Sequence, residues 1–292
     1  MTTDPVLAAL EAGPFCLIRP DEQRLPFVFA SPHSGRTYPE SFIARSSLSA
    51  LALRRSEDAY VDELFDCVAG FGCPLIAARF PRAYVDANRA PGELDADMFA
   101  GPLSLPMETP GPRVHAGLGV IPRVVRDGVE IYRARLPTEE AEWRLERLYR
   151  PYHTALAALV EQTLARFGCA VVIDCHSMPS MPAVPELVFG DCHGTSATAA
   201  LTRHVERAFA SQGFATARNA PYAGGFTTHL YARRETGVHA LQIELNRALY
   251  LDEEQIEKTA SFAGIKGRLT GALRQVLNFD IAQLRPRRLA AE

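Results

Sequence analysis

The chain has 292 residues, of which 47% are hydrophobic and 22% are charged. This balance is typical of a folded globular protein and excludes an intrinsically disordered chain. The formal net charge is −3, and no basic stripe predicts a nucleic-acid partner. No apolar run approaches the roughly 20 residues that a membrane-spanning helix needs, so no membrane partner is expected.

The N-terminus and the cysteines bear on the cellular compartment. The first residues include Asp4 and no basic segment, so no signal peptide is expected. Six cysteines are scattered along the chain without a CxxC pair, which argues against a disulfide framework and against a structural zinc knuckle. We therefore expect a soluble protein of the reducing cytoplasm.

Short apolar runs, taken in chain order, predict buried strands at residues 27–31, 74–80, 170–174, 186–190 and 239–246. Helical patterns lie between and after them, at residues 56–72, 138–168, 194–213 and 252–277. Ser56 is a candidate N-cap of the first helix, and Pro151 predicts a break or kink in the second. Strands that alternate with helices predict a three-layer α/β fold, in which helices flank a mixed, largely parallel sheet.

Three segments lie outside this pattern. In residues 119–136, apolar and polar residues alternate on both sides of an Arg-Asp-Gly sequence, which predicts a peripheral hairpin. Residues 101–118 are rich in proline and glycine and predict a surface loop, and residues 285–292 predict a frayed tail. Because no linker divides the chain, we expect residues 1–292 to form a single domain.

Polar residues lie at or near the carboxyl ends of three predicted strands. Ser31 and His33 close the first, Asp174 and His176 follow the third, and Glu244 lies within the last. Ligands of open α/β sheets bind beyond the carboxyl ends of the strands, so these side chains are expected to share one crevice.

The last strand has two different faces. Leu241, Ile243 and Leu245 share one face, whereas Gln242, Glu244 and Asn246 share the other. The polar face predicts that this strand lines a polar site, because an isolated buried carboxylate is costly unless a cation neutralises it. The alternative for Glu244 is a salt bridge to an arginine such as Arg247.

A catalytic zinc needs three nitrogen or oxygen ligands and an open position. His33 and His176 are the best-placed histidines, and the third ligand is a carboxylate from among Glu57, Asp58 and Asp62. The alternative readings are ordinary helix N-terminal acids and structural histidines.

An arginine cluster and a glycine-rich loop are the candidate substrate contacts. Arg82, Asn88 and Arg89 surround a short apolar run and suit an anionic substrate or a developing oxyanion. The alternative is that they form surface salt bridges with Asp86 or Glu93. The loop 219–228 is flexible enough to close over a ligand, through Tyr222, Gly225 and Thr227, or is an ordinary turn.

These segments together resemble the N-formylglutamate amidohydrolase family. The resemblance covers about residues 27 to 252 and is carried, in order, by the motifs SPHSG, SEDAYVDEL, RAYVDANR, IDCHSM, FGD, PYAGGFTT and QIELNR. The family is similar to zinc carboxypeptidases and aspartoacylase-type deacylases, which implies the phosphorylase/hydrolase-like α/β fold.

The resemblance implies a role for each matching residue. It implies His33, Asp58 and His176 as ligands of Zn²⁺, or of another divalent metal. It implies Asn88 with Arg89 as the substrate carboxylate clamp, Arg82 as oxyanion support and Glu244 as general base. One departure from the peptidase pattern is Arg36, which stands where a HxxE ligand would be. Glu57 therefore remains an alternative to Asp58.

The implied activity is metal-dependent hydrolysis of the amide bond of a small anionic N-acyl amino acid. N-formyl-L-glutamate would give formate and glutamate, through a zinc-activated water and Glu244. Asp174 would orient a metal ligand or make a structural hydrogen bond. The alternatives are a zinc carboxypeptidase, another N-acyl-amino-acid deacylase, or a non-catalytic binding domain.

Overall fold

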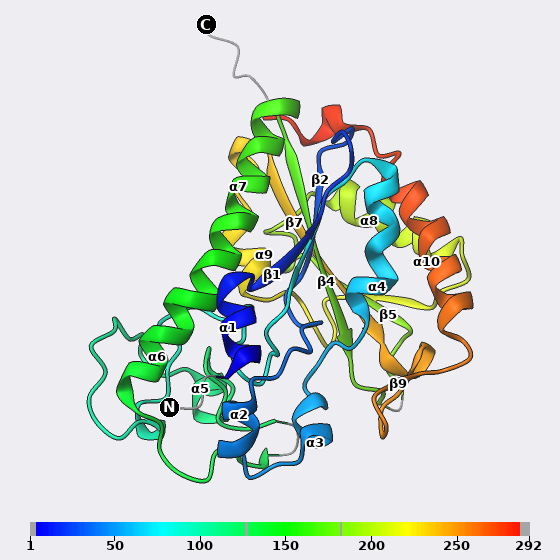
Figure 1. Ribbon diagram of the computed structural model, residues 1–292. Helices are drawn as coiled ribbons and strands as arrows, with labels where there is room; N and C mark the ends of the chain where they lie inside the picture. The colour runs from blue at the N-terminus through cyan, green and yellow to red at the C-terminus, as the bar shows by residue number, and fades with distance from the viewer. Residues whose placement is uncertain (1–3, 126–127, 182, 287–292) are drawn as a thin grey trace, which may run out of the picture.

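The computed structural model describes residues 4–125, 128–181 and 183–286. Its centre is a seven-stranded sheet with the strand order β1-β3-β2-β4-β7-β5-β6 (Figure 1). The strands are β1 Phe15–Ile18, β2 Phe27–Ser31, β3 Leu75–Ala78, β4 Ala170–Met178, β5 Leu187–Gly190, β6 Thr216–Arg218 and β7 Val238–Asn246. β2 is parallel to β3 and β4, β4 is parallel to β7, and β5 is parallel to β6, whereas β1 and β5 run antiparallel to β3 and β7. The mixed, largely parallel sheet is confirmed.

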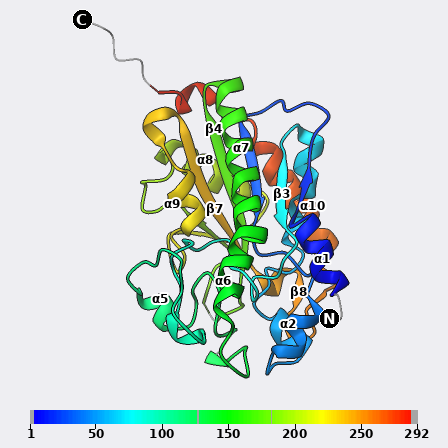
Figure 2. The same cartoon turned by 60° about the vertical axis from the view of Figure 1, so that its left-hand side comes forward.

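Helices cover both faces of this sheet. They are α1 Pro5–Ala12, α2 Glu40–Arg45, α3 Ala50–Arg54, α4 Val61–Phe65, α5 Pro112–His115, α6 Thr138–Arg144, α7 Arg150–Phe167, α8 Ala199–Ala210, α9 Phe226–Tyr231 and α10 Phe262–Val276. In Figure 1, α7 lies on one side of the sheet and α4, α8 and α10 lie on the other. Turned by 60°, the long α7 crosses the face of the sheet beside α9 (Figure 2). The predicted three layers are therefore confirmed.

Alternation along the strands builds two separate cores. Val171 and Ile173 of β4 join the core under α4, α8 and α10, whereas Ala170 and Val172 join the core under α7. The face toward α7 turns polar at the carboxyl end of the strand, since the next residue of that parity is Asp174. The polar positions of β4 therefore lie on the face toward α7, at the carboxyl end of the strand.

The pairing of β4 with β7 aligns the polar residues of both strands. Asp174 lies opposite Gln242, and His176 lies opposite Glu244. The predicted split of β7 into an apolar and a polar face is confirmed, because Ile243 is in the core on the far side of the sheet. β4 continues to Met178, beyond the predicted end at residue 174, because these polar positions keep the ladder with β7.

The predicted helix 56–72 begins later than expected. α4 starts at Val61, and Tyr60 before it has a left-handed backbone with φ 62°. The Ser56 hydroxyl donates to the Leu53 carbonyl instead of capping the helix. Residues 66–71 continue as a 3-10 helix that ends at Gly72. The prediction of an N-cap at Ser56 is wrong, because residues 56–60 form a loop whose Asp58 N–H donates to the His33 carbonyl.

Two other helical predictions also change. Helix 138–168 does not end at Pro151, because a π-helical turn, Leu145–Tyr149, joins α6 to α7 and Pro151 lies in the first turn of α7. The segment 252–277 begins as the hairpin β8 Leu251–Asp252 and β9 Glu257–Lys258, and α10 starts only at Phe262. The helix predicted at 194–213 is present as α8.

The remaining segments add little to the sheet. Residues 119–136 contain an antiparallel bridge between Val124 and Glu130, while residues 126 and 127 of the expected turn lie outside the described residues. Most of the expected tail, residues 287–292, also lies outside them. The short strands β1 and β6 were not predicted.

Across the described ranges, no helix is long and apolar enough to cross a membrane. The remaining short 3-10 helices are Ala96–Met98, Arg234–Thr236, Arg247–Leu249 and Ile281–Leu284.

Candidate active site

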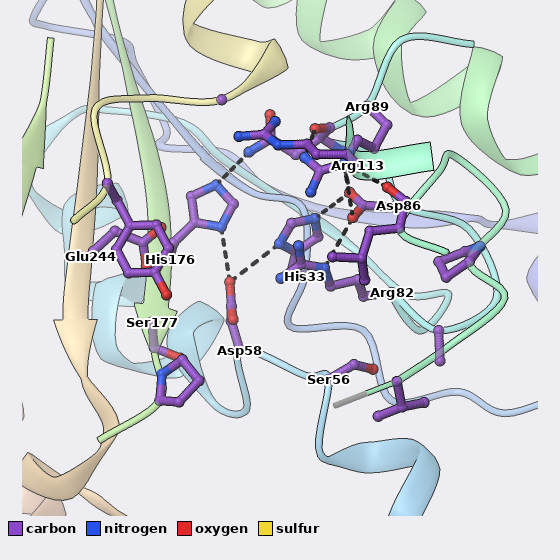
Figure 3. A pocket seen from close by; sticks show the side chains of 18 of the residues that line it. His33, Ser56, Asp58, Arg82, Asp86, Arg89, Arg113, His176, Ser177 and Glu244 are labelled. Atoms are coloured by element: carbon purple, nitrogen blue, oxygen red, sulfur yellow. Dashed lines mark hydrogen bonds and ion pairs between the residues drawn. The ribbon is translucent and has the colours of Figure 1, made fainter. Parts of the chain in front are cut away.

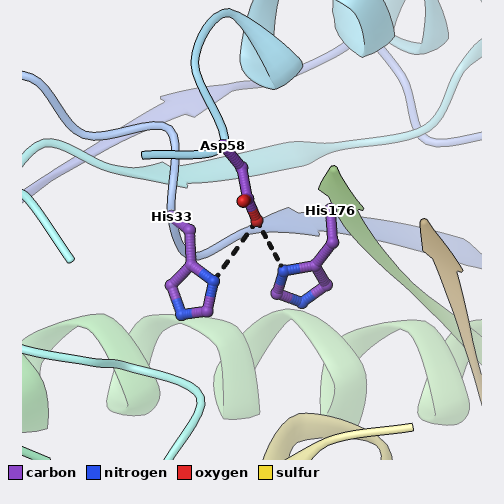
Figure 4. A group of neighbouring side chains, drawn as sticks. All are labelled: His33, Asp58 and His176. Carbon is purple, nitrogen blue, oxygen red and sulfur yellow. Dashed lines mark hydrogen bonds and ion pairs between the residues drawn. The ribbon is translucent and has the colours of Figure 1, made fainter. Parts of the chain in front are cut away.

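Three predicted ligands converge at the carboxyl end of the sheet. His33 follows β2, Asp58 lies in the loop before α4, and His176 lies near the end of β4 (Figure 4). Asp58 Oδ2 is 3.3 Å from His33 Nδ1 and 2.8 Å from His176 Nδ1. One ligand atom from each residue lies within 4.8 Å of the other two, and all three residues are buried. Two imidazoles and one carboxylate are the ligand set of many catalytic zinc sites.

The surroundings of both histidines fit a bound cation. His33 Nε2 is 2.7 Å from Asp86 Oδ1, and His176 Nε2 is 2.9 Å from Asp174 Oδ2. A carboxylate behind each imidazole fixes the ring, and this is the usual arrangement of a metal-binding histidine. Apart from its 3.3 Å contact with Asp58, the buried His33 Nδ1 has no hydrogen-bond partner among the described residues. The inward-facing nitrogens are thus in place to ligate a metal ion.

The electrostatics of the cluster also favour a cation. Burial alone would raise the pKa of Asp58, but His176 and His33 outweigh it and hold that pKa well below its usual range. Burial likewise opposes the charged form of His176, yet Asp174 and Asp58 raise its pKa well above the usual value. The buried Asp58 carboxylate therefore keeps its negative charge and attracts positive charge to the space between the rings.

The structure distinguishes between the candidate carboxylates. Glu57 accepts a hydrogen bond from the Tyr38 hydroxyl at 2.8 Å and from Arg54 Nε at 3.0 Å, and so points away from the histidines. Asp62 pairs with Arg36 at 3.3 Å. Asp58 is the one among the three candidates that reaches His33 and His176.

Glu244 lies beside this cluster. It is directly opposite His176 in the sheet and lines the same cavity. Its Oε1 accepts a hydrogen bond of 2.6 Å from Gln242 Nε2. Burial raises the pKa of Glu244 to about 7. A carboxyl group with a pKa near neutrality suits a role in proton transfer.

Arg82 is attached to the same network through Asp86. Arg82 Nε is 3.0 Å from Asp86 Oδ2, while Asp86 Oδ1 binds His33 and accepts from the Asn88 N–H at 2.8 Å. Burial opposes the ionisation of Asp86, but Arg82 and His33 outweigh it and hold its pKa well below the usual range. The Arg82 side chain remains 28% exposed and borders the cavity (Figure 3).

Arg89 is held by backbone oxygens. Its Nε donates to the Leu118 carbonyl at 3.0 Å and its Nη1 to the Asn88 carbonyl at 2.8 Å. Asp86 is 4.0 Å away. Burial lowers the pKa of Arg89, and the neighbouring Arg82 and Arg113 act in the same direction against Asp86. A cation with this much positive charge around it is suited to bind an anion.

The glycine-rich loop contacts the network through Asn88. Asn88 Nδ2 lies 3.1 Å from His176 Nε2, and Asn88 Oδ1 accepts from the Thr227 N–H at 2.7 Å. A Cβ atom at Gly225 would overlap the Asn88 amide, so this close approach requires glycine. Tyr222 and Gly225 line the cavity, whereas the Thr227 side chain is buried behind it and contributes its backbone.

These groups enclose a cavity of about 360 Å³. Its polar wall carries five arginines and three carboxylates, namely Arg55, Arg82, Arg89, Arg113, Arg247, Asp58, Asp86 and Glu244. The volume falls in the range of small-molecule sites, and the excess of arginine suits a small anionic ligand.

Comparison with known sequences places the chain in a family. A sequence model of the N-formylglutamate amidohydrolase family matches residues 25–251. The chain belongs to this family. The match covers β2 through β7, and every residue that lines the cavity lies within it.

Individual family members show the same relationship. The chain is similar to an N-formylglutamate deformylase of Pseudomonas aeruginosa strain PAO1, with 29% identity over 79% of this chain and 84% of that protein. A second N-formylglutamate deformylase, from Pseudomonas putida, is 26% identical over 80% of this chain and 84% of its own. The crystal structure of N-formylglutamate amidohydrolase from Ralstonia eutropha JMP134 superposes with a TM-score of 0.84 and 36% identity, covering 90% of this chain and 97% of that one.

Three polar residues of the cavity were not predicted as functional. Asp86 and Arg247 entered the sequence analysis only as salt-bridge partners, and Arg113 did not enter it. Arg247 contacts Asp58, and not Glu244 as the alternative reading had it. The signal for Asp86 is its place at the end of the apolar run before Asn88. We find no comparable local signal for Arg113.

Proposed function

We propose that this protein is a metal-dependent amidohydrolase that hydrolyses N-formyl-L-glutamate to formate and glutamate. The observation that carries the proposal is the buried His33, Asp58 and His176 cluster, which shares one cavity with Glu244 and a set of arginines. The names of the similar proteins, N-formylglutamate deformylase and N-formylglutamate amidohydrolase, support the choice of substrate.

The proposed metal ligands are His33, Asp58 and His176. Zinc is the first candidate, and cobalt, manganese and iron also accept such a ligand set. When bound, a divalent ion polarises a carbonyl and lowers the pKa of a coordinated water toward ~7. Asp86 and Asp174 keep the two imidazoles oriented for this role.

Glu244 is the proposed general base. It takes the proton of the attacking water and then passes that proton to the leaving amine nitrogen, so the proton is conserved through the step. Burial keeps the pKa of Glu244 at about 7, and a cation at the neighbouring ligands would lower it and favour the carboxylate. The hydrogen bond from Gln242 holds the carboxylate on the cavity side of β7.

Arg82 is the proposed stabiliser of the oxyanion that forms at the amide carbonyl. Its guanidinium is fixed by Asp86 and retains exposure to the cavity. Groups of this kind contribute roughly 3–4 kcal/mol of transition-state stabilisation in other enzymes.

Arg89 is the proposed anchor of the amino-acid carboxylate, assisted by Asn88. Its guanidinium is held by carbonyl oxygens in an electropositive setting, and a bound carboxylate would fix the register of the scissile bond. The loop with Tyr222, Gly225 and Thr227 borders the same space and fixes the Asn88 amide.

The test is formate release from N-formyl-L-glutamate by protein reloaded with zinc or cobalt. N-acetyl-L-glutamate and a peptide with a C-terminal glutamate serve as competing substrates. We expect the formyl compound to be hydrolysed and Glu244→Gln to be inactive on it. Release of the C-terminal residue from the peptide, without formate release, would establish a carboxypeptidase instead.

A further inference from the structure

The arginines of the cavity differ in what they bind. Arg82 pairs with Asp86, and Arg247 pairs with Asp58 at 2.9 Å. Arg89 is held by two carbonyl oxygens. These three guanidinium groups therefore have fixed positions around the ligand cluster.

Arg113 is different. It belongs to the short helix α5 and lines the same cavity. Among the residues that the structure describes, its guanidinium makes no hydrogen bond or ion pair; its carbonyl accepts from the Leu118 N–H. In Figure 3 it lies next to Arg89, and its charge acts on the pKa of Arg89. Two adjacent guanidinium groups that face one cavity repel each other until an anion separates them.

The segment after α5 supplies an apolar wall to the same part of the cavity. Leu118, Pro122, Val124 and Val125 line it, and the Arg89 guanidinium is tied to this segment through the Leu118 carbonyl. The methylene chain of a bound ligand would contact these apolar side chains, while the charged groups at its two ends would meet Arg89 and Arg113. This pairing of an apolar wall with two cations fits a short dicarboxylate.

We propose that Arg113 binds the side-chain carboxylate of the substrate while Arg89 binds the α-carboxylate, so that Arg113 selects N-acyl derivatives of acidic amino acids. This inference rests on the proposed amidohydrolase function. Arg113 is a specificity-determining residue here, and the reaction at the amide bond does not require it. Arginine suits the role because its planar fork binds a carboxylate through two parallel hydrogen bonds.

The test compares two substrates that differ in one charge. The quantity measured is kcat/KM in the wild type and in Arg113→Gln. The two substrates are N-formyl-L-glutamate and its isostere N-formyl-L-glutamine, whose side chain is neutral. Loss of one charge-assisted contact predicts a decrease of about 10- to 100-fold for the glutamate substrate, mainly through KM. The glutamine substrate should change by less than about 3-fold. Arg113→Lys, which keeps the charge and loses the fork, should recover part of the preference.

Arg55→Gln is the matched control, because Arg55 is an exposed arginine that also lines the cavity. It removes the same charge, and we expect it to preserve the preference for glutamate over glutamine. An equal loss on both substrates in Arg113→Gln, or a larger loss of preference in Arg55→Gln, would overturn the role of Arg113 and leave the proposed function intact. If the wild type hydrolysed neither substrate, the proposed function itself would fail, and the role of Arg113 with it.

Discussion

Arg247 Nη2 lies 2.9 Å from Asp58 Oδ1, although 189 residues separate the two in the sequence. Both side chains are buried, and Arg247 is further held by Ser177 through Nε at 3.1 Å. The pair occupies one oxygen of Asp58 and leaves Oδ2 directed at His33 and His176. The segment after β7 thus orients the Asp58 carboxylate, the proposed metal ligand in the loop before α4.

Arg247 is expected to support metal binding without touching the metal. Arg247→Met should lower metal affinity by about 10- to 100-fold, because Asp58 would lose the contact that fixes its orientation. Titration against a competing chelator measures this affinity. Arg247→Lys should fall between the wild type and Arg247→Met. An unchanged affinity in Arg247→Met would limit the ion pair to a structural role.

Glu244→Gln separates metal binding from catalysis. We expect it to retain the metal content of the wild type and to lose about 10²- to 10⁴-fold in kcat, the usual contribution of a general base. Elemental analysis and formate release on the same preparation measure the two quantities. Gln242→Leu serves as a comparison, because it removes the hydrogen bond to Glu244 and keeps the carboxylate. A fully active Glu244→Gln protein would exclude Glu244 from the mechanism.

The sequence predicts the sheet and most of the site for one physical reason. Apolar runs define strands, and a polar residue at the end of such a run must face something polar, as at His176 and Glu244. The alternation within β7 also assigns Glu244 to the cavity face, and the pairing with β4 confirms that face.

What the sequence misses depends on contacts between distant segments. Glu57 and Asp58 are neighbours, and their sequence does not distinguish them. Tyr38 and Arg54 engage Glu57, while Arg247 orients Asp58. The late start of α4 has the same origin, because the loop that carries Asp58 replaces the expected first helical turn.

The two histidines are expected to be required for metal retention. His33→Ala and His176→Ala, purified without added metal, should each lose the bound ion, since a three-ligand site with one ligand removed binds weakly. Elemental analysis per chain gives the result directly. His229→Ala is the control, because His229 is exposed on α9 and does not line the cavity. Normal metal content in both ligand variants would mean that the histidines are structural.

His153 is expected to make stability depend on pH. Burial lowers its pKa to about 4, and its ring lies 2.9 Å from both the Ala87 carbonyl and the Tyr231 hydroxyl. In the unfolded chain the pKa of a histidine is about 6.5, so below this pH His153 binds a proton in the unfolded state but not in the folded state. The free energy of unfolding therefore falls as the pH drops from about 6.5 toward about 4. Between pH 7.5 and pH 5 this amounts to about 1–2 kcal/mol of unfolding free energy, after allowance for the partial exposure of the ring.

Urea unfolding of the wild type and of His153→Gln at both pH values measures this contribution. The comparison is the difference between the two proteins in their loss of stability on acidification, so the titration of the other histidines cancels. We expect the variant to be less stable at pH 7.5 because it loses the ring contacts, and to lose less stability than the wild type at pH 5. Equal losses in the two proteins would show that His153 accepts its proton without cost in the folded state.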